Sequence, residues 1–158
     1  MIKWLSVAGV VIVADQLSKW VVTQNLHLGE RIDVLQIFSW VRWHNDGAAF
    51  SILSGGGGWQ LWFFVALAIG FAGFIIYELR RLPVGHWVMG LAYGLIMGGA
   101  LGNMIDRVSA GYVVDFVLVH YHDYYFPAFN VADSALTVGA AIWIGCMIYE
   151  ARAARANA

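Results

Sequence analysis

The stretch that decides the fold reads GGALGNMIDRVSAGYVVDFVLVHYHDYYFPAFNVADS and runs from Gly98 to Ser134. It begins inside one apolar run, crosses a polar and aromatic segment, and ends where the next apolar run starts. Asp115 lies in the middle segment, and Asp133 opens the second run. On one continuous helix they would lie about 27 Å apart, and Pro127 disfavours such a helix. A chain that turns back between two apolar runs can instead bring both carboxylates to one level.

The composition points to a bilayer. Hydrophobic residues make up 61% of the 158 residues and charged residues 12%, and the mean hydropathy is +0.69. Soluble domains are nearer half apolar and a quarter charged, so this chain has too little charge to cover a water-facing surface. The net charge of -1 offers no basic field for nucleic acid. The length predicts a single membrane-embedded domain over residues 1–158.

Four apolar runs are long enough to cross a membrane, which takes about 20 helical residues. They cover residues 2–22, 59–77, 86–104 and 132–149. The first run is interrupted by Asp15 and Lys19 and is not followed by a small-residue cleavage site, so we expect a retained anchor rather than a removed signal peptide. These runs predict an all-α integral membrane protein with four transmembrane helices.

The distribution of Lys and Arg predicts the orientation. The basic residues that would share one side, close to helix ends, are Lys3, Arg80, Arg81, Arg152 and Arg155. The opposite side would hold Arg31, Arg42 and Arg107. Because basic flanks stay inside, we expect both termini in the cytoplasm and two outer segments, residues 23–58 and 105–131. In a Gram-negative cell the outer side is the periplasm. The residues after Glu150 are expected to extend the last helix.

The first outer segment carries several local signals. Residues 37–44 partly alternate between apolar and polar and predict a small extracytoplasmic β-region. Residues 45–47 are a turn signal. Residues 48–53 predict a short interfacial helix, which could act as a lid. Four glycines at 55–58 follow, as either a flexible linker or a functional hinge.

Polar residues gather at one level of the predicted bundle, at the outer helix ends. They are Asp15, Lys19, Asn103, Asp106, Arg107, Asp115, Asn130 and Asp133. An ionisable group in lipid costs about 2.5–3.5 kcal/mol on insertion scales, so such groups tend to face one another and to be functional. Asp15 and Lys19 are four residues apart with the acid first, which favours an ion pair, with direct chemistry as the alternative.

The roles of the other polar residues stay open at this point. Asn103 and Arg107 share a helix face, where they would either hold a ligand or support the structure. Asp106 would be a partner of Arg107 or a helix-end group. His120 and His122 lie in a segment that reads as an interfacial loop, and without a third ligand or a His-Glu-x-x-His pattern they do not support a metal site.

Other nucleophiles find little support. Ser18, Ser51 and Ser134 lack a Gly-x-Ser-x-Gly context. The single Cys146 lies in an apolar run and excludes an internal disulfide. The paired aspartates therefore remain the main candidates for chemistry.

Five short motifs, in order along the chain, resemble one known family. They are Asp15–Lys19 (DQLSK), Asn45–Ser51 (NDGAAFS), Gly102–Val108 (GNMIDRV), Val114–Phe116 (VDF) and Phe129–Ser134 (FNVADS). Together they resemble the lipoprotein signal peptidases (signal peptidase II) of bacterial membranes. One such motif alone would be weak, but five in order across four spans are specific.

The resemblance implies a membrane aspartyl endopeptidase of the bacterial cytoplasmic (inner) membrane. It would remove the signal peptide of prolipoproteins by cutting before a diacylglyceryl-modified cysteine, near the outer leaflet. It implies Asp115 and Asp133 as catalytic residues, with no metal or other cofactor. Candidates for substrate binding or site support are Asp15, Lys19, Asn45, Gly47, Asn103, Asp106, Arg107, Asn130 and Ala132. The expected partners are lipid-modified prolipoproteins and membrane lipid, with no nucleic acid and no required oligomer.

Two rival functions remain at this stage. A proton-coupled transporter or channel subunit would use Asp15, Lys19, Asp115 and Asp133 as a proton relay, although these groups do not line a path from face to face. A non-catalytic membrane assembly factor would use the outer segment as a docking surface. Both rivals predict that no peptide is cleaved.

Overall fold

Four long helices form the body of the protein. The computed structural model describes residues 1–47 and 58–156. The helices are α1 (Ile2–Asn25), α2 (Trp59–Arg81), α3 (Trp87–Ala110) and α4 (Val131–Ala156), and each is long and apolar enough to cross a membrane. The four predicted spans are thus confirmed as helices, and α4 continues past Glu150 to Ala156, as expected for the residues that the structure describes.

The third helix is longer than predicted. It ends at Ala110, so the first residues of the expected outer segment 105–131 are helical, while the membrane boundary of that segment stays a prediction. The polar last turns of α3 remain helical because their side chains bond to groups on other elements, as described below. The helix stops at Gly111, which has a φ of 85° and whose N–H bonds to the carbonyl of Arg107.

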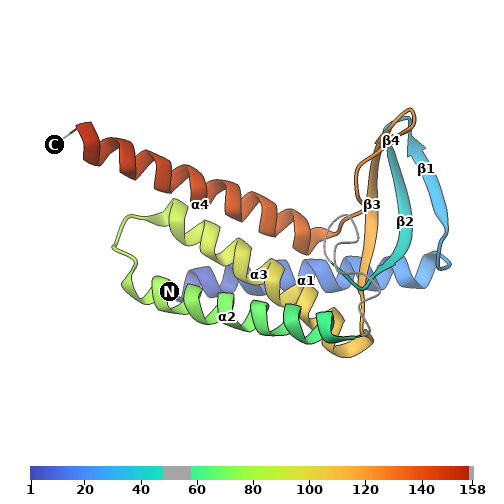
Figure 1. The fold of residues 1–158 in the computed structure, drawn as a ribbon, viewed down its shortest axis with the longest axis horizontal. Coiled ribbons are helices and arrows are strands. Elements are labelled where there is room, and N and C mark those ends of the chain that lie inside the picture. Colours follow the sequence, from blue (N-terminus) through green and yellow to red (C-terminus); the bar gives the residue numbers. More distant parts are fainter. Residues whose placement is uncertain (48–57, 157–158) are drawn as a thin grey trace.

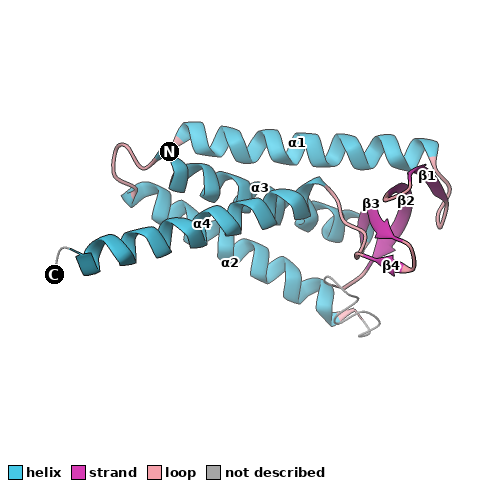
Figure 2. Ribbon diagram, turned by 90° about the horizontal axis from the view of Figure 1, so that it is seen from above, coloured by secondary structure: helices cyan, strands magenta, loops and turns pink. Residues whose placement is uncertain are grey.

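The third helix is also the central one. In its most apolar window 61% of the residues are buried, against 28%, 28% and 17% for α1, α2 and α4. The outer helices instead expose large apolar side chains, among them Val10, Trp20, Phe63 and Ile144. Figures 1 and 2 show the other helices arranged around α3. A central helix with apolar outward faces around it is what lipid contact requires.

Small residues let α1 and α3 approach closely. Gly94, Gly98 and Gly102 are spaced by four residues on the face of α3 that meets α1. A Cβ on Gly98 would lie 2.7 Å from the Cβ of Val11, and one on Gly102 would lie 2.9 Å from a carboxylate oxygen of Asp15. Lipid is as apolar as the side chains themselves, so burying apolar side chains between helices gains little free energy there. Close backbone packing of this kind holds the helices together instead.

A four-stranded antiparallel sheet completes the fold. Its strands are β1 (Arg31–Leu35), β2 (Phe38–Asn45), β3 (Val113–Tyr121) and β4 (Tyr124–Tyr125), in that spatial order. Strand β2 confirms the strand predicted at residues 37–44. The loop expected around His120 and His122 is wrong: β3 and β4 form a hairpin there, and His122 occupies its turn with a φ of 52°. The β-branched residues of VVDFVLVHY explain the strand.

The sheet lies at one end of the bundle, beside the C-terminal ends of α1 and α3 and the N-terminal ends of α2 and α4 (Figures 1 and 2). Both chain termini lie at the opposite end. The polar residues at the outer helix ends therefore meet the sheet. The interfacial helix predicted at residues 48–53, and residues 55–57 of the glycine run, lie outside the described residues.

Candidate active site

The start of α4 is built by a reciprocal pair of hydrogen bonds. The side-chain oxygen of Asn130 accepts from the backbone N–H of Asp133 at 2.9 Å. In return, Oδ2 of Asp133 accepts from the backbone N–H of Asn130 at 3.2 Å. This is a capping box, in which an N-cap residue and the residue three positions later satisfy each other's free N–H groups. It fixes the Asp133 carboxylate at a helix N-terminus, where the helix dipole favours negative charge.

The second carboxylate oxygen of Asp133 is held from α3. Nδ2 of Asn103 donates to Oδ1 of Asp133 at 2.7 Å. Both oxygens of Asp133 therefore accept a hydrogen bond, one from its own helix start and one from a neighbouring helix.

Strand β3 carries Asp115 into the same region. The residue is only 3% exposed. Its Oδ1 accepts from Nδ2 of Asn130 at 2.8 Å, and its Oδ2 accepts from Nδ2 of Asn45 at the end of β2 at 2.9 Å. The register of β2 on β3 shifts between Trp40 and Trp43, and Trp43 is the residue paired with Asp115. The irregularity in strand pairing therefore lies directly beside Asp115. Bulges of this kind are common next to active sites, where they change the direction in which a side chain points.

Burial and a like charge act on Asp115. Burial first, and then the negative charge of Asp133, raise the pKa of Asp115 to about 7, against an ordinary value of 3.8. Hydrogen bonds from Asn45 and Asn130 and the charge of Lys19 act in the opposite direction. Asp115 can therefore hold a proton close to neutral pH, where an ordinary aspartate is ionised.

One side chain connects the two aspartates. Asn130 is fully buried. Its amide nitrogen bonds to Asp115, while its amide oxygen and its backbone N–H bond to Asp133. Two carboxyl groups from different elements are thus held by one residue, through its side-chain amide and its backbone N–H, as the return of the chain between α3 and α4 allows.

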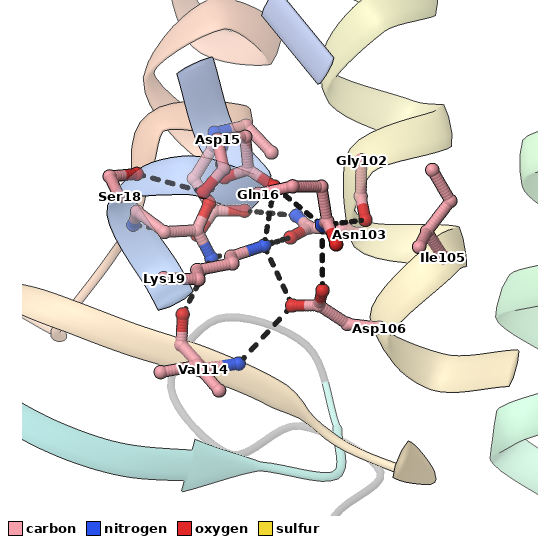
Figure 3. Close-up of polar contacts among 12 residues, drawn as sticks. Asp15, Gln16, Ser18, Lys19, Gly102, Asn103, Ile105, Asp106 and Val114 are labelled. Atoms are coloured by element: carbon pink, nitrogen blue, oxygen red, sulfur yellow. Dashed lines mark hydrogen bonds and ion pairs between the residues drawn. The ribbon is translucent and has the colours of Figure 1, made fainter. Parts of the chain in front are cut away.

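Behind the aspartates lies a buried charged cluster, drawn in Figure 3. Nζ of Lys19 is 2.7 Å from Oδ2 of Asp15, which is the predicted ion pair. The same ammonium is 2.7 Å from Oδ2 of Asp106 and 3.0 Å from Oδ1 of Asn103. Asp106 was expected to pair with Arg107 or to act as a helix-end group, and it pairs with Lys19 instead. Ala132, fully buried, donates its N–H to Oδ1 of Asp15 at 2.9 Å.

Arg107 and Gly47 meet at the opposite side of the site. The guanidinium of Arg107 donates to the carbonyl of Gly47 at 2.7 Å and lies 4.5 Å from the centroid of the Phe64 ring. The N–H of Gly47 bonds to Oδ1 of Asn45, whose amide holds Asp115. Arg107 therefore supports the turn that begins at Asn45, which is a hydrogen-bond partner of Asp115.

Two cavities open beside Asp133, with volumes of about 400 Å³ and 540 Å³. Four residues line both of them: Asn103, Arg107, Asp133 and Thr137. The rest of their walls is largely apolar, with Phe126 and Phe129 in the first and Phe64 and Trp143 in the second. Asp133, Asn103 and Arg107 thus face two largely apolar cavities.

The histidines that suggested a metal lie elsewhere. His120 is buried in the sheet, where its Nε2 lies 2.8 Å from Oγ of Ser39 and 3.2 Å from the guanidinium of Arg31. His122 is exposed in the hairpin turn. Among residues 1–47 and 58–156, no three His, Cys, Asp or Glu side chains are grouped so as to hold a metal ion.

One member of the site was missed from the sequence. Nε2 of Gln16 donates to Oδ1 of Asp106 at 2.8 Å and lies 3.2 Å from Oδ2 of Asp15. The signal was present, because Gln16 is a further polar residue inside an apolar span, directly beside Asp15.

The chain is similar in sequence and in fold to known bacterial proteins. The family model described as signal peptidase (SPase) II matches residues 7–149. A lipoprotein signal peptidase of Shewanella woodyi is 48% identical over 90% of this chain and 81% of that protein. One of Teredinibacter turnerae is 42% identical over 98% of this chain and 92% of that protein. A solved structure described as a bacterial membrane enzyme has a TM-score of 0.86 and 32% identity, covering 96% of this chain and 90% of the other.

Proposed function

Because the chain belongs to the lipoprotein signal peptidase (signal peptidase II) family, we propose that Asp115 and Asp133 are its two catalytic carboxylates. As a member of this family, the protein is a bacterial multi-pass membrane protein and an aspartic endopeptidase that cleaves the signal peptide from prolipoproteins. The observation that carries the catalytic assignment is that one residue, Asn130, donates to both carboxyl groups: its side-chain amide donates to Asp115 and its backbone N–H donates to Asp133.

The proposed reaction is hydrolysis by one water molecule. Two neighbouring carboxyl groups share a proton, because both do not ionise easily together. The ionised carboxylate takes a proton from water while the water oxygen attacks the scissile carbonyl carbon, and the protonated carboxyl donates to the carbonyl oxygen. The tetrahedral intermediate collapses when its C–N bond breaks: the leaving nitrogen takes the proton that the first carboxylate received from water, and the hydroxyl formed from the carbonyl oxygen returns its proton to the second carboxylate. The signal peptide leaves with a new carboxyl group and the lipoprotein with a new amine.

The resting proton is assigned to Asp115. This carboxyl is nearly inaccessible, and its pKa is raised to about 7. Asp133 sits at a helix N-terminus and lines both cavities, so it is the group that a water molecule can approach. During turnover the pair titrates as a unit, and the proton passes between its members.

The remaining polar residues are proposed to support the site or to contact the substrate. Asn45 and Asn130 hold Asp115, and Asn103 holds Asp133. Arg107 faces both cavities, in a position to bind a backbone carbonyl of the substrate. The apolar cavity walls suit the lipid-modified end of the substrate and its apolar signal segment.

We also propose the placement in the membrane. The sheet and the start of α4 lie at one end of the bundle, and both termini lie at the other (Figures 1 and 2). Asp115 is on β3 of that sheet and Asp133 is at that start of α4. The basic flanks at the terminal end, such as Lys3 and Arg80, support a cytoplasmic position for that end. The active site then lies near the outer leaflet of the cytoplasmic membrane, where membrane lipid surrounds it. Helices and sheet act as one domain, and one copy suffices, since both aspartates belong to one chain.

The experiment uses the purified full chain in detergent with a diacylglyceryl-modified prolipoprotein. Asp115→Asn and Asp133→Asn should each abolish cleavage while the melting profile shows a folded protein. Asp123→Asn, in the turn between β3 and β4, is the matched control and should retain full activity. Substantial cleavage by either of the first two variants would refute the catalytic pair.

A further inference from the structure

The ammonium of Lys19 is fully used by three acceptors. It contacts a carboxylate oxygen of Asp15, a carboxylate oxygen of Asp106 and the amide oxygen of Asn103. An ammonium has three N–H donors and no acceptor, so these contacts exhaust it. Its side chain is 5% exposed. Figure 3 shows the three acceptors converging on it from α1 and α3.

The two carboxylates reach beyond Lys19 to backbone groups on other elements. Oδ1 of Asp15 accepts from the N–H of Ala132 at 2.9 Å, at the start of α4. Oδ2 of Asp106 accepts from the N–H of Val114 at 3.4 Å, at the start of β3. Ala132 directly precedes Asp133, and Val114 directly precedes Asp115. Each arm of the cluster therefore holds the backbone N–H of the residue that directly precedes one of the proposed catalytic residues.

The third contact sets the orientation of an amide. Since Lys19 only donates, Asn103 must present its oxygen to the ammonium and its NH₂ group away from it. That NH₂ group donates to Oδ1 of Asp133 at 2.7 Å. Lys19 thereby determines which end of Asn103 faces the catalytic carboxylate.

Two neighbours keep the cluster rigid. Gln16 donates to Oδ1 of Asp106 and lies within hydrogen-bond distance of Asp15, so it joins the two arms directly. Gly102 leaves no room for a side chain against Asp15. The cluster thus has little freedom to adjust one arm without the other.

Charge balance alone does not explain the arrangement. Asp15 neutralises Lys19 by itself, so the carboxylate of Asp106 adds a second buried negative charge that is costly in this position. What the second carboxylate adds is the connection to β3.

We infer that Lys19 is a positioning residue that, through Asp15 and Asp106, sets the relative placement of Asp133 and Asp115. The inference rests on the proposed function, since it assigns Lys19 a role only if these two aspartates are catalytic. Lys19 itself touches neither the substrate nor the reacting atoms.

The first test is Lys19→Met, which keeps an unbranched side chain of similar length and removes the charge. The matched control is Lys3→Met, at the other end of α1, which should leave the kinetics unchanged. Misplacing the carboxylates should lower kcat by about 100-fold with KM changed little. The charged groups that act with Asp115 include Asp133, Lys19 and Arg107, and the carboxylate of Asp106 lies 2.7 Å from the ammonium of Lys19. Loss of the cation removes an influence that lowers the pKa of Asp115, so the pH profile of kcat should move to higher pH.

The second test is Asp106→Asn, which keeps the pair between Lys19 and Asp15 and is expected to fold even if Lys19→Met does not. It should also lower kcat, but removal of a negative charge should move the pH profile to lower pH. Opposite shifts in the two variants are the expected signature, because a merely structural cluster would lower the melting temperature and the active fraction without moving either profile.

The outcomes separate the two proposals. Unchanged kcat and pH profile in a folded variant of Lys19 or Asp106, with Asp115→Asn and Asp133→Asn inactive, would overturn the positioning role and leave the catalytic pair intact. Cleavage by the Asp115→Asn or Asp133→Asn variant would overturn the catalytic pair, whatever the Lys19 variants show. Melting curves in detergent, measured on every variant, report the folded fraction.

Discussion

Asn130 and Asp133 hold each other at the start of α4: the amide oxygen of Asn130 accepts from the N–H of Asp133, and the carboxylate of Asp133 accepts from the N–H of Asn130. The same Asn130 side chain also donates to Asp115. Asn130 therefore both caps the helix and links the two carboxyl groups, so a change at this residue should affect stability and activity together.

Replacement of Asn130 by alanine should reduce both properties. Loss of the cap should cost about 1 kcal/mol of stability, visible as a lower melting temperature. Loss of the bond to Asp115 should lower kcat by about 10- to 100-fold, because the carboxylates lose their common support. Asn25→Ala is the control: the side chain of Asn25 bonds to the carbonyl of Val21 on an exposed surface of α1, so cleavage by that variant should equal wild type. Equal kinetics for both variants would contradict the linking role.

Activity should fall as the pH rises through about 7. The raised pKa keeps Asp115 protonated up to about 7, and above that pH both carboxyl groups are ionised, so the proton donor is lost. Asn45→Ala removes a hydrogen bond that lowers the pKa of Asp115, so the descending limb should move to higher pH. The measurement is kcat/KM against pH for both proteins. A descending limb that stays in place in the variant would show that Asp115 does not control it.

Asp115 should make the folded protein less stable at neutral pH than in acid. Its pKa is about 7 when folded and 3.8 in the unfolded chain, so the folded state binds more protons between these values. Stability should therefore decrease as the pH rises from about 4 to about 7. Melting temperatures of wild type and Asp115→Asn across this range check the effect. The variant should lose much of the pH dependence and be the more stable protein at pH 8; a parallel decline in both would contradict this assignment.

The close contact of α1 and α3 predicts which glycines matter. A Cβ on Gly98 would press on Val11 and on the carbonyl of Ala8, so Gly98→Ala should destabilise the protein by about 1–3 kcal/mol. A Cβ on Gly145, in α4, meets nothing within 4 Å, so Gly145→Ala should be neutral or stabilising by up to about 1 kcal/mol. Thermal melting in detergent distinguishes the two, and equal melting temperatures would refute the packing argument.

The sequence predicted the helical framework well because its signals are long. A span of about 20 apolar residues has few alternative structures, and each of the four runs is helical. The ion pair of Asp15 and Lys19 was also predictable, because four residues on a helix define a face.

Contacts between elements were harder to predict. The partner of Asp106 was misassigned because its ammonium lies 87 positions earlier in the chain, on a different helix. Strand β3 was missed because its histidines and tyrosines resemble an interfacial loop, while its pairing with β2 depends on residues far away in the sequence. Spacing along one helix can be read locally, but a register between distant strands cannot.

The two proposed catalytic carboxyls lie on different elements, one on β3 and one at the start of α4. A chain in which only the first three helices have inserted possesses Asp115 but neither Asp133 nor Asn130 in place. On the proposed assignment, the catalytic pair is complete only when α4 is in place, so the last helix to insert is also the one that completes the protease.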